Sequence, residues 1–349
     1  MNKYYTRACN FYYGKNSKIN IKKKKTIPLN GNNLISFDNI EIISRRKSKV
    51  VNLKDINRLS KNLKIKINQD LENIKKKKSF KYLNLSKTPI LMGIVNLTPD
   101  SFSDGGKYNN KNLAMKHVYS LLSSGAKIID IGGESTRPGA GDISPNKEWN
   151  RIKPVLKNLK NKKCFISIDT RKSFVMEKAS KIKIDLINDV SGLNYDKNTV
   201  QILKKTKKPF VIHHMQGIPK NMQIRPTYKN VLLDIYDFFE AKLKYLRKQG
   251  IKHNNIILDP GIGFGKNLKH NITLLKNISI FHSLGLPVML GLSRKRFIRD
   301  ISKQNDTKER IGGTISSCIQ AYLQGVQILR VHDVKEIYQA FKVFKELQN

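Results

Sequence analysis

"ILMGIVNLTPDSFSDGG", residues 90–106, places a short apolar run directly before a dense group of polar residues. The apolar part, Ile90–Val95, has the length and composition of a buried strand. The polar part holds two carboxylates, three hydroxyls and two adjacent glycines. A plain turn needs only about two to four residues of this kind. The stretch therefore indicates a buried strand that is followed directly by residues of a functional site.

The same arrangement recurs toward the C-terminus: a short apolar run, polar or glycine residues, and then an amphipathic stretch. The runs are Ile90–Val95, Ile128–Ile131, Phe165–Ile168, Ile184–Ile187, Phe210–Ile212, Ile256–Leu258, Val288–Leu292 and Val326–Val331. The stretches with helical spacing include Asn112–Ser123, Val231–Lys248, Lys308–Gln324 and Val334–Leu347. Continuous apolar strands that alternate with helices are typical of a parallel sheet covered on its faces.

Eight such units predict an α/β fold of the (β/α)8 class, a TIM barrel, over residues 89–349. An open, doubly wound sheet is the alternative, because periodicity alone does not show closure. In a barrel, reactive residues lie just after the strands, at the C-terminal face. All eight runs end in polar or ionisable groups, and this recurrence favours a functional site at that face.

Residues 1–88 differ from the rest and are expected to form a basic N-terminal extension. Residues 1–30 are expected to be poorly ordered, with a charge run at Lys22–Lys25. Residues 34–52 alternate like one or two strands, and residues 54–78 have the pattern of a basic helix. The sequence of this segment shows no catalytic or binding motif.

The charge of the chain is strongly positive, with 67 Lys and Arg against 26 Asp and Glu, a net +41. Such a balance fits either a nucleic-acid partner or a solvated surface. The excess is densest in residues 1–88 but present throughout the chain. The interleaved aromatic residues and motifs of nucleic-acid-binding faces are missing. We therefore expect a solvated basic surface and no specific nucleic-acid partner.

Composition also bears on the compartment. No apolar run approaches the roughly 18 residues that span a bilayer, and no signal-peptide core is present. The three cysteines, Cys9, Cys164 and Cys318, are far apart and form no CxxC pair, so neither a disulfide framework nor a structural zinc site is indicated. These features predict a cytoplasmic protein without a membrane partner. The lack of acidic residues before Asp38 is a feature of organellar transit peptides and keeps that alternative open.

Two groups of candidate residues follow from the strand ends. Asn96 ends the first run, where its amide could hold a metal-bound or phosphate oxygen. In "GAKIIDIGGESTRPG", residues 125–139, the hydroxyl of Thr136 and the guanidinium of Arg137 suit a phosphate. Asp130 lies within the preceding strand, and both a structural and a functional role are open for it.

Three further residues, Asp169, Asn188 and Asp259, each follow a different run. Together they could bind a flat heterocycle with several N–H donors, although Asp169 could instead cap a helix.

Basic and aromatic residues follow the later runs. "GLSRKRF", residues 291–297, places Arg294, Lys295 and Arg296 after the seventh run, and Arg330 and His332 belong to the eighth. Loops after strands seven and eight of such barrels often bind phosphate.

"DPGIGFGKN", residues 259–267, matches neither the dinucleotide nor the P-loop spacing, but Phe264 offers a ring face. His213 and His214 lack zinc-binding companions and are interpreted as a packing residue and a polar supporting residue.

Together these motifs resemble the dihydropteroate synthase family, the folate-pathway enzymes that sulfonamides inhibit. "GIVNLTPDSFSDGG", "IIDIGGESTRPG", "INDVSG", "HHMQG", "LDPGIGFGKN", "GLSRKRF" and "ILRVHDV" stand in the family's order over about residues 88–345. The resemblance implies a (β/α)8 barrel, usually a homodimer, with Mg²⁺ as cofactor. It implies condensation of 4-aminobenzoate with (7,8-dihydropterin-6-yl)methyl diphosphate to give 7,8-dihydropteroate and diphosphate. The departure of diphosphate would leave a carbocation-like centre.

The resemblance also assigns roles to residues. The pterin is expected at Asp169, Asn188, Asp259 and Lys295. The diphosphate is expected at Asn96, Thr136, Arg137, Arg330 and His332, with Asn96 also touching Mg²⁺. The 4-aminobenzoate slot is expected to be lined by Phe102, Pro138, Phe264 and Lys295, and Met215 is a further substrate-binding candidate. Asp104 would help to close the first loop, and Asp104, Arg137 and Lys295 are the expected catalytic residues.

Two alternatives remain at the level of sequence. A related folate-dependent methyltransferase barrel would share the Asp and Asn pterin-binding residues without needing the anion-binding cluster. A nucleic-acid-binding protein on a degenerate barrel would have lost the site residues. Arg296 is a departure, because many members of the family carry a small hydroxyl residue there.

Overall fold

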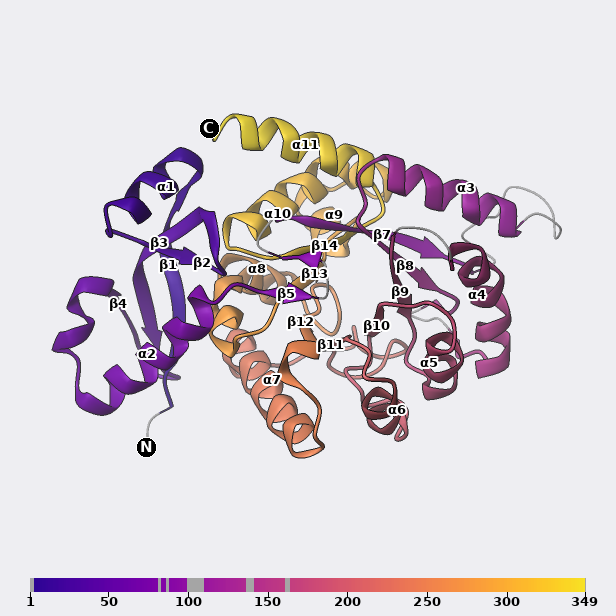
Figure 1. The fold of residues 1–349 in the computed structure, drawn as a ribbon, viewed down its shortest axis with the longest axis horizontal. Helices are drawn as coiled ribbons and strands as arrows, with labels where there is room; N and C mark the ends of the chain where they lie inside the picture. Colours follow the sequence, from indigo (N-terminus) through magenta and orange to yellow (C-terminus); the bar gives the residue numbers. More distant parts are fainter. Residues whose placement is uncertain are drawn as a thin grey trace.

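Eight parallel strands form the centre of the molecule, and helices surround them (Figure 1). The computed structural model describes residues 3–80, 83–85, 88–98, 110–135, 141–160 and 164–348. The strands are β7 (Ile90–Asn96), β8 (Ile128–Gly132), β9 (Phe165–Asp169), β10 (Leu186–Asp189), β11 (Phe210–His213), β12 (Ile256–Asp259), β13 (Met289–Gly291) and β14 (Ile328–Val331). They pair in the order β12-β11-β10-β9-β8-β7-β14-β13, and a parallel bridge between Leu258 and Val288 joins the two ends. The predicted barrel is confirmed, and the open sheet is excluded.

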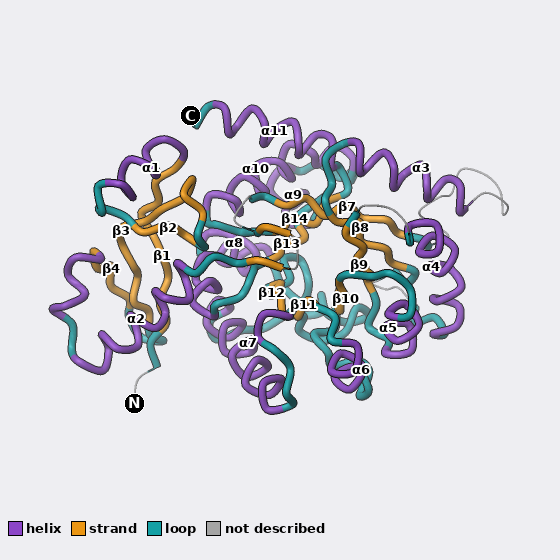
Figure 2. The backbone as a smooth tube through the Cα atoms, viewed as in Figure 1, coloured by secondary structure: helices purple, strands orange, loops and turns teal. Residues whose placement is uncertain are grey.

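The helices alternate with the strands along the chain (Figure 2). They are α3 (Asn110–Ser123), α4 (Pro145–Leu159), α5 (Ser173–Ser180), α6 (Thr199–Thr206), α7 (Val231–Lys248), α8 (Leu268–Lys276), α9 (Arg296–Ser302), α10 (Ile311–Leu323) and α11 (Val334–Glu346). Short 3-10 turns are η3 (His253–Asn255), η4 (Ile278–Leu284) and η5 (Lys308–Arg310). Side chains before several helices accept the first free N–H groups, as Asn230 does from Leu233 at 3.1 Å and Asn267 from His270 at 2.9 Å.

The inward-facing side chains of the strands divide into an apolar and a polar layer. Near the N-terminal ends, nine apolar side chains form one buried cluster with Leu85: Ile90, Met92, Ile128, Phe165, Leu186, Val211, Ile257, Met289 and Ile328. Because side chains alternate along a strand, the residue two positions later returns to the same face. In β8, β10 and β12 those residues are Asp130, Asn188 and Asp259. The strands are therefore apolar inside at one end of the barrel and polar inside at the other.

The outward-facing residues of the strands, such as Ile129, Ile166 and Ile187, belong to the large core beneath the helices. This explains why the strands read as continuous apolar runs: both faces are buried, one against the barrel interior and one against the helices.

The N-terminal extension contains more regular structure than the sequence predicted. Its elements are β1 (Tyr5–Tyr13), α1 (Gly14–Lys22), β2 (Ile27–Leu29), β3 (Asn32–Ile43), β4 (Ser48–Asn52), η1 (Leu53–Arg58), α2 (Lys61–Lys75), β5 (Ser79–Phe80) and β6 (Leu83–Asn84). Strand β3 pairs antiparallel with β1, β2 and β4.

The expectation of poor order in residues 1–30 is therefore wrong for Lys3 to Asn30. Tyr5, Ala8 and Leu29 are buried there, in contacts with distant parts of the chain that local periodicity does not reveal.

The extension is joined to the barrel by a continuous apolar core and by ion pairs. The Tyr5 ring meets the Tyr236 ring edge-on at 5.1 Å, and Ser279 donates a hydrogen bond to the Ala8 carbonyl at 2.9 Å. Lys3 and Arg45 pair with three carboxylates on α7, namely Asp234, Asp237 and Glu240, at 2.5–2.8 Å. Three acids of one helix are thus engaged by the extension, in a chain with few acids.

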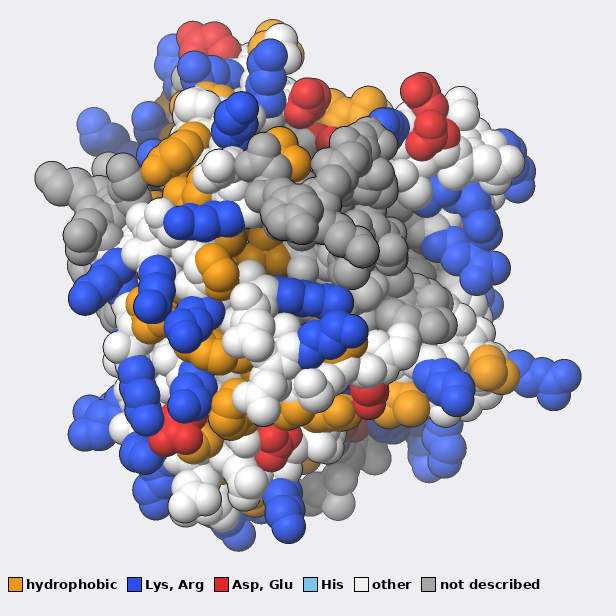
Figure 3. Space-filling model, turned by 90° about the vertical axis from the view of Figure 1, so that its right-hand side faces the viewer, with side chains coloured by type: hydrophobic (Ala, Val, Ile, Leu, Met, Phe, Trp, Pro, Cys, Tyr) orange, Lys and Arg blue, Asp and Glu red, His pale blue; other side chains and the backbone are white. Residues whose placement is uncertain are grey.

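The basic charge is widely distributed. On the face shown in Figure 3, Lys and Arg side chains are scattered among hydrophobic, acidic and uncharged polar groups. Within the described ranges, none of the helices combines the length and the apolar character needed to cross a bilayer.

A substitution of Tyr5 tests whether the extension and the barrel unfold together. Because Tyr5 is fully buried in their shared core, Tyr5→Ala should lower the free energy of unfolding by about 3–5 kcal/mol. Urea unfolding followed by tryptophan fluorescence reports on the barrel, since Trp149 lies in α4. Tyr245→Ala, on the exposed side of α7, is the control and should change the free energy by less than about 0.5 kcal/mol. An unchanged midpoint for Tyr5→Ala would show that the two parts unfold independently.

Candidate active site

The polar layer of the barrel contains a largely buried ion-pair group centred on Arg330. Its Nε lies 2.6 Å from Oδ2 of Asp130, and a terminal nitrogen lies 2.7 Å from Oδ2 of Asp169. Asn188 donates from Nδ2 to Oδ2 of Asp130 at 3.1 Å. Side chains from β14, β8, β9 and β10 therefore meet at one point near the C-terminal ends of the strands.

Two carboxylates stabilise the positive charge of Arg330. Burial alone lowers the pKa of an arginine, but Asp130 and Asp169 raise the pKa of Arg330 above its ordinary value. Burial raises the pKa of Asp169 to about 7, and the positive charge of Arg330 opposes that rise. The question left open for Asp130 is thus resolved in part: it is the buried partner of Arg330. Its Oδ1 and the Ser167 hydroxyl have no hydrogen-bond partner among the described residues.

A second group contains Asp259, Lys295 and Phe264. Burial raises the pKa of Asp259 to about 6, and burial lowers the pKa of Lys295 to about 8, while the two charges attract each other. The Lys295 ammonium lies 4.1 Å from the centroid of the Phe264 ring, a cation–π contact. Oδ1 of Asp259 accepts the N–H of Gly261 at 2.8 Å. Gly261 has φ +70°, and a Cβ there would lie 2.0 Å from the His214 carbonyl oxygen, so this turn requires glycine.

His213, the last residue of β11, and His214, which follows it, are neutral supporting residues. Nδ1 of His213 lies 2.9 Å from the Val190 carbonyl oxygen, and its ring meets Phe264 edge-on at 4.6 Å. The His214 ring meets Phe238 edge-on at 4.9 Å. Burial and the charge of Lys266 hold the pKa of each histidine well below its usual range.

The remaining candidates follow other strands. Asn96 is the last residue of β7, and Met215 and His332 follow β11 and β14; all three are partly exposed. The His332 N–H donates to Oγ of Ser293 at 3.3 Å. Five candidates lie outside the described residues: Phe102, Asp104, Thr136, Arg137 and Pro138.

The basic triplet after β13 does not act as one cluster. Arg294 pairs with Asp333, and its Nε lies 3.0 Å from Oδ2 of that residue. Lys295 faces Phe264, whereas Arg296 is mostly exposed, 3.9 Å from a carboxylate oxygen of Asp300. Of the three, Lys295 is the one directed toward the polar layer.

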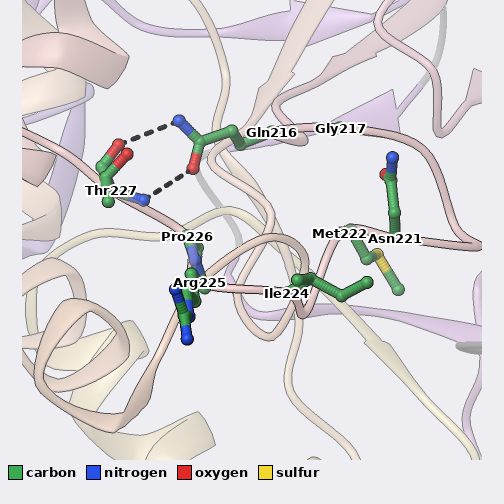
Figure 4. A pocket seen from close by; sticks show the side chains of 8 residues that line it. All are labelled: Gln216, Gly217, Asn221, Met222, Ile224, Arg225, Pro226 and Thr227. Carbon is green, nitrogen blue, oxygen red and sulfur yellow. Dashed lines mark hydrogen bonds between the residues drawn. The ribbon is translucent and has the colours of Figure 1, made fainter.

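Two cavities lie near the loop that carries Phe264. One, of about 310 Å³, lies within the β11–α7 loop, where the Gln216 side chain forms hydrogen bonds of 2.8 and 3.0 Å with the Thr227 backbone (Figure 4). The other, of about 160 Å³, lies between the β12–α8 loop and α9 and is lined in part by Gly263, Lys266 and Arg296. Both are hollows beside the Phe264 loop, and Asp169, Asn188 and Arg330 line neither.

Residues 92–332 match the family model described as "Pterin binding enzyme". The chain belongs to this family. It is 44% identical over 263 residues to a dihydropteroate synthase of Neisseria meningitidis serogroup C, covering 74% of this chain and 93% of the relative. With the enzyme of Escherichia coli strain K12 it is 40% identical over 256 residues, covering 73% and 90%.

Solved structures agree with the family assignment. A Yersinia pestis dihydropteroate synthase in complex with a sulfonamide drug has 42% identity and a TM-score of 0.72, covering 76% of this chain and 96% of its own. A Xanthomonas albilineans dihydropteroate synthase with 4-aminobenzoic acid has 36% identity and a TM-score of 0.72, covering 76% and 95%. The enzyme class inferred from the motifs, a transferase of folate synthesis, is therefore confirmed.

The raised pKa of Asp169 predicts a pH-dependent effect of removing its charge. In the wild type the folded chain retains a proton on Asp169 up to about pH 7, whereas the unfolded chain releases it near pH 4. The folded state therefore loses free energy relative to the unfolded state as pH rises through this window. Asp169→Asn has no such loss, so its stability relative to wild type should increase by roughly 2–4 kcal/mol between pH 4 and 7.

Urea unfolding of both proteins across this pH range measures the difference, from which groups distant from Asp169 cancel because they titrate alike in both proteins. A difference that does not change with pH would show that Asp169 has an ordinary pKa.

Proposed function

We propose that the chain is a dihydropteroate synthase that joins 4-aminobenzoate to (7,8-dihydropterin-6-yl)methyl diphosphate and releases diphosphate. The observation that carries the proposal is the meeting of Asp169, Asn188, Asp259, Lys295 and Arg330 at one end of the barrel. Structural neighbours with 4-aminobenzoic acid and with 7,8-dihydropteroate support the choice of substrates. The relatives and structures compared above are dihydropteroate synthases, which favours this function over the methyltransferase alternative.

The polar layer suits the amino-pyrimidinone edge of a pterin. That edge offers several N–H donors in one plane, and the carboxylates and amide of Asp169, Asn188 and Asp259 supply acceptors from β9, β10 and β12. Oδ1 of Asp130, which has no hydrogen-bond partner in the described part of the chain, adds a buried acceptor to the same layer. In this proposal, the pterin donates hydrogen bonds to these oxygens, and Lys295 donates to an acceptor atom of the ring.

Diphosphate departure requires positive charge. Arg330 and Lys295 supply it within the described residues, and Arg137 is proposed to add a third cation. Among the described residues no cluster of three His, Cys, Asp or Glu could hold a metal ion. A single amide oxygen, that of Asn96, fits Mg²⁺, which commonly keeps several waters and binds through few protein ligands plus substrate phosphates. Bound there, Mg²⁺ would neutralise charge on the leaving diphosphate.

The second substrate needs positioning more than activation. A neutral arylamine is already nucleophilic, and the carbon that it attacks carries a leaving group beside an electron-rich ring. The Phe264 face, held against Lys295, is proposed as one wall of its slot. Phe102, Pro138, Thr136, His332 and Met215 are proposed to complete the substrate contacts, and Asp104 to help close the site. Homodimerisation and a cytoplasmic location are proposed on the family resemblance.

The direct test is an assay of the purified chain with pterin diphosphate, 4-aminobenzoate and Mg²⁺. Diphosphate and dihydropteroate should form in equal amounts. Asp169→Ala and Lys295→Ala should each lower kcat/KM by about 10²-fold or more, because each removes a contact to the pterin. Lys248→Ala, at the end of α7, is the control and should keep wild-type rates. Near-normal rates in Asp169→Ala or Lys295→Ala, in folded protein, would show that the pterin assignment is wrong.

The proposed role of Mg²⁺ has its own test. Removal of divalent cations should abolish turnover, and added Mg²⁺ should restore it. Because Asn96 would contribute one ligand, Asn96→Ala should raise the Mg²⁺ concentration for half-maximal rate by about tenfold. Full activity of the wild type in excess chelator would refute the cofactor assignment, and an unchanged Mg²⁺ requirement in Asn96→Ala would refute the ligand assignment.

A further inference from the structure

Lys266 is a buried lysine beside the site for which the proposed chemistry has no use. It is 2% exposed, and its Nζ donates to the carbonyl oxygen of Phe264 at 2.9 Å. The same Nζ lies 3.1 Å from Nδ1 and 3.3 Å from the carbonyl oxygen of His214. Among the described residues, no carboxylate lies within hydrogen-bond distance of it. Burying an ammonium group without a paired carboxylate costs folding free energy. A lysine kept at this position therefore indicates that its contacts with the loop have a role.

Lys266 holds the backbone of Phe264, the residue whose ring is proposed to form one wall of the 4-aminobenzoate slot. The Phe264 ring lies between two groups of the site, with the Lys295 ammonium 4.1 Å from its centroid and the His213 ring edge-on at 4.6 Å. His214, which contacts Lys266 from the other side, follows His213 directly. Lys266 therefore joins the backbone of the β12–α8 loop to the end of β11.

The other backbone groups around Phe264 are also fixed by side chains. Asn271 accepts the Gly263 N–H at 2.7 Å, and Gln223 donates to the Gly263 carbonyl at 2.6 Å. Tyr228 donates to the Gly265 carbonyl at 2.8 Å. Lys266 supplies the bond to the carbonyl between them, that of Phe264. The loop is thus held at three successive carbonyls, and Lys266 is the buried member of that set.

We propose that Lys266 is a positioning residue, which fixes the Phe264 ring against Lys295 and thereby sets the width of the slot for the aromatic amine. The inference rests on the proposed function, since it assigns the ring to that substrate. Lys266 acts through Phe264 and His214 and does not touch either substrate. Its loss should affect the aromatic amine more than the pterin, which is held by Asp169, Asn188 and Asp259.

Lys78 provides a matched control from the extension. It is also buried, 5% exposed, and its Nζ donates to a backbone carbonyl, that of Asn73, at 2.5 Å. Burial lowers the pKa of Lys266 and of Lys78 alike to about 7. The two lysines therefore share burial, partner type and proton affinity, and differ in whether the carbonyl that they bind adjoins the site.

The test compares Lys266→Met with Lys78→Met in the full chain. Both substitutions keep an unbranched side chain, one heavy atom shorter, and remove its donors, so both should lower the melting temperature. Lys266→Met should raise KM for 4-aminobenzoate about tenfold and change KM for the pterin diphosphate less than about twofold. Lys78→Met should leave both KM values unchanged. Equal KM values for wild type and folded Lys266→Met would overturn the positioning role, as would equal rises for both substrates.

A second variant covers the case in which Lys266→Met does not fold. Tyr228→Phe removes the neighbouring bond to the Gly265 carbonyl and leaves Lys266 in place, so it should raise the same KM by about two- to threefold. An unchanged KM in that variant would count against loop positioning.

A crystal structure of the folded variant tests the geometry without any assay. The Phe264 ring should be turned away from Lys295 in Lys266→Met, and an unmoved ring would overturn the inference. Absence of turnover in the wild type would refute the proposed function, and the crystal structure would still decide the role of Lys266.

Discussion

In a closed barrel of eight parallel strands, every second side chain points into a space that only the two ends connect to water. At the N-terminal end, that space is filled by apolar residues of the eight strands, among them Ile90 of β7 and Ile328 of β14. Two positions further along several strands, the same face carries Asp130, Asn188, Asp259 and Arg330. Little water reaches these polar and charged groups, so each must form hydrogen bonds or ion pairs with another of them or with a ligand. The bridging of Asp130 and Asp169 by Arg330 is the part of this arrangement that the chain satisfies by itself.

That pairing bears on how the site could respond to a substrate. Arg330 is bound to two carboxylates, and the pKa of Asp169 is raised to about 7 in spite of it. An incoming group that donates hydrogen bonds to Asp169 would compete with Arg330 for the carboxylate, and an incoming anion would compete with the carboxylates for Arg330. The ion pair therefore holds both a cation, Arg330, and carboxylates at this end of the barrel, and each of them can exchange its present partner for a substrate group.

The strands and the larger helices could be predicted from sequence because both faces of each strand are buried and each helix has one apolar side. Helix α7 was predicted with its observed bounds, and β7 to within one residue. The periodicity of the sequence alone did not distinguish the barrel from an open sheet, because closure depends on the bridge between Leu258 and Val288. Most of the polar layer was found from strand ends, but the pairing of Arg294 with Asp333 and the burial of Lys266 depend on neighbours distant in sequence. The extension was the least predictable part, because Tyr5 and Ala8 are buried by residues more than 200 positions away.

The dependence of the extension on the barrel has a consequence during synthesis. Its first residues leave the ribosome first, yet their partners on α7 and η4, and the contact between Lys15 and Gln348, come from the far part of the chain. At about 5–20 residues per second, the interval before the last of these partners appears is on the order of 15–70 s. Throughout that interval the apolar side chains of β1 lack the part of their cover that α7 and η4 provide. Nascent chains would be most open to chaperones and proteases in the extension, and a truncation that removed α7 and η4 would leave its buried side chains without these partners.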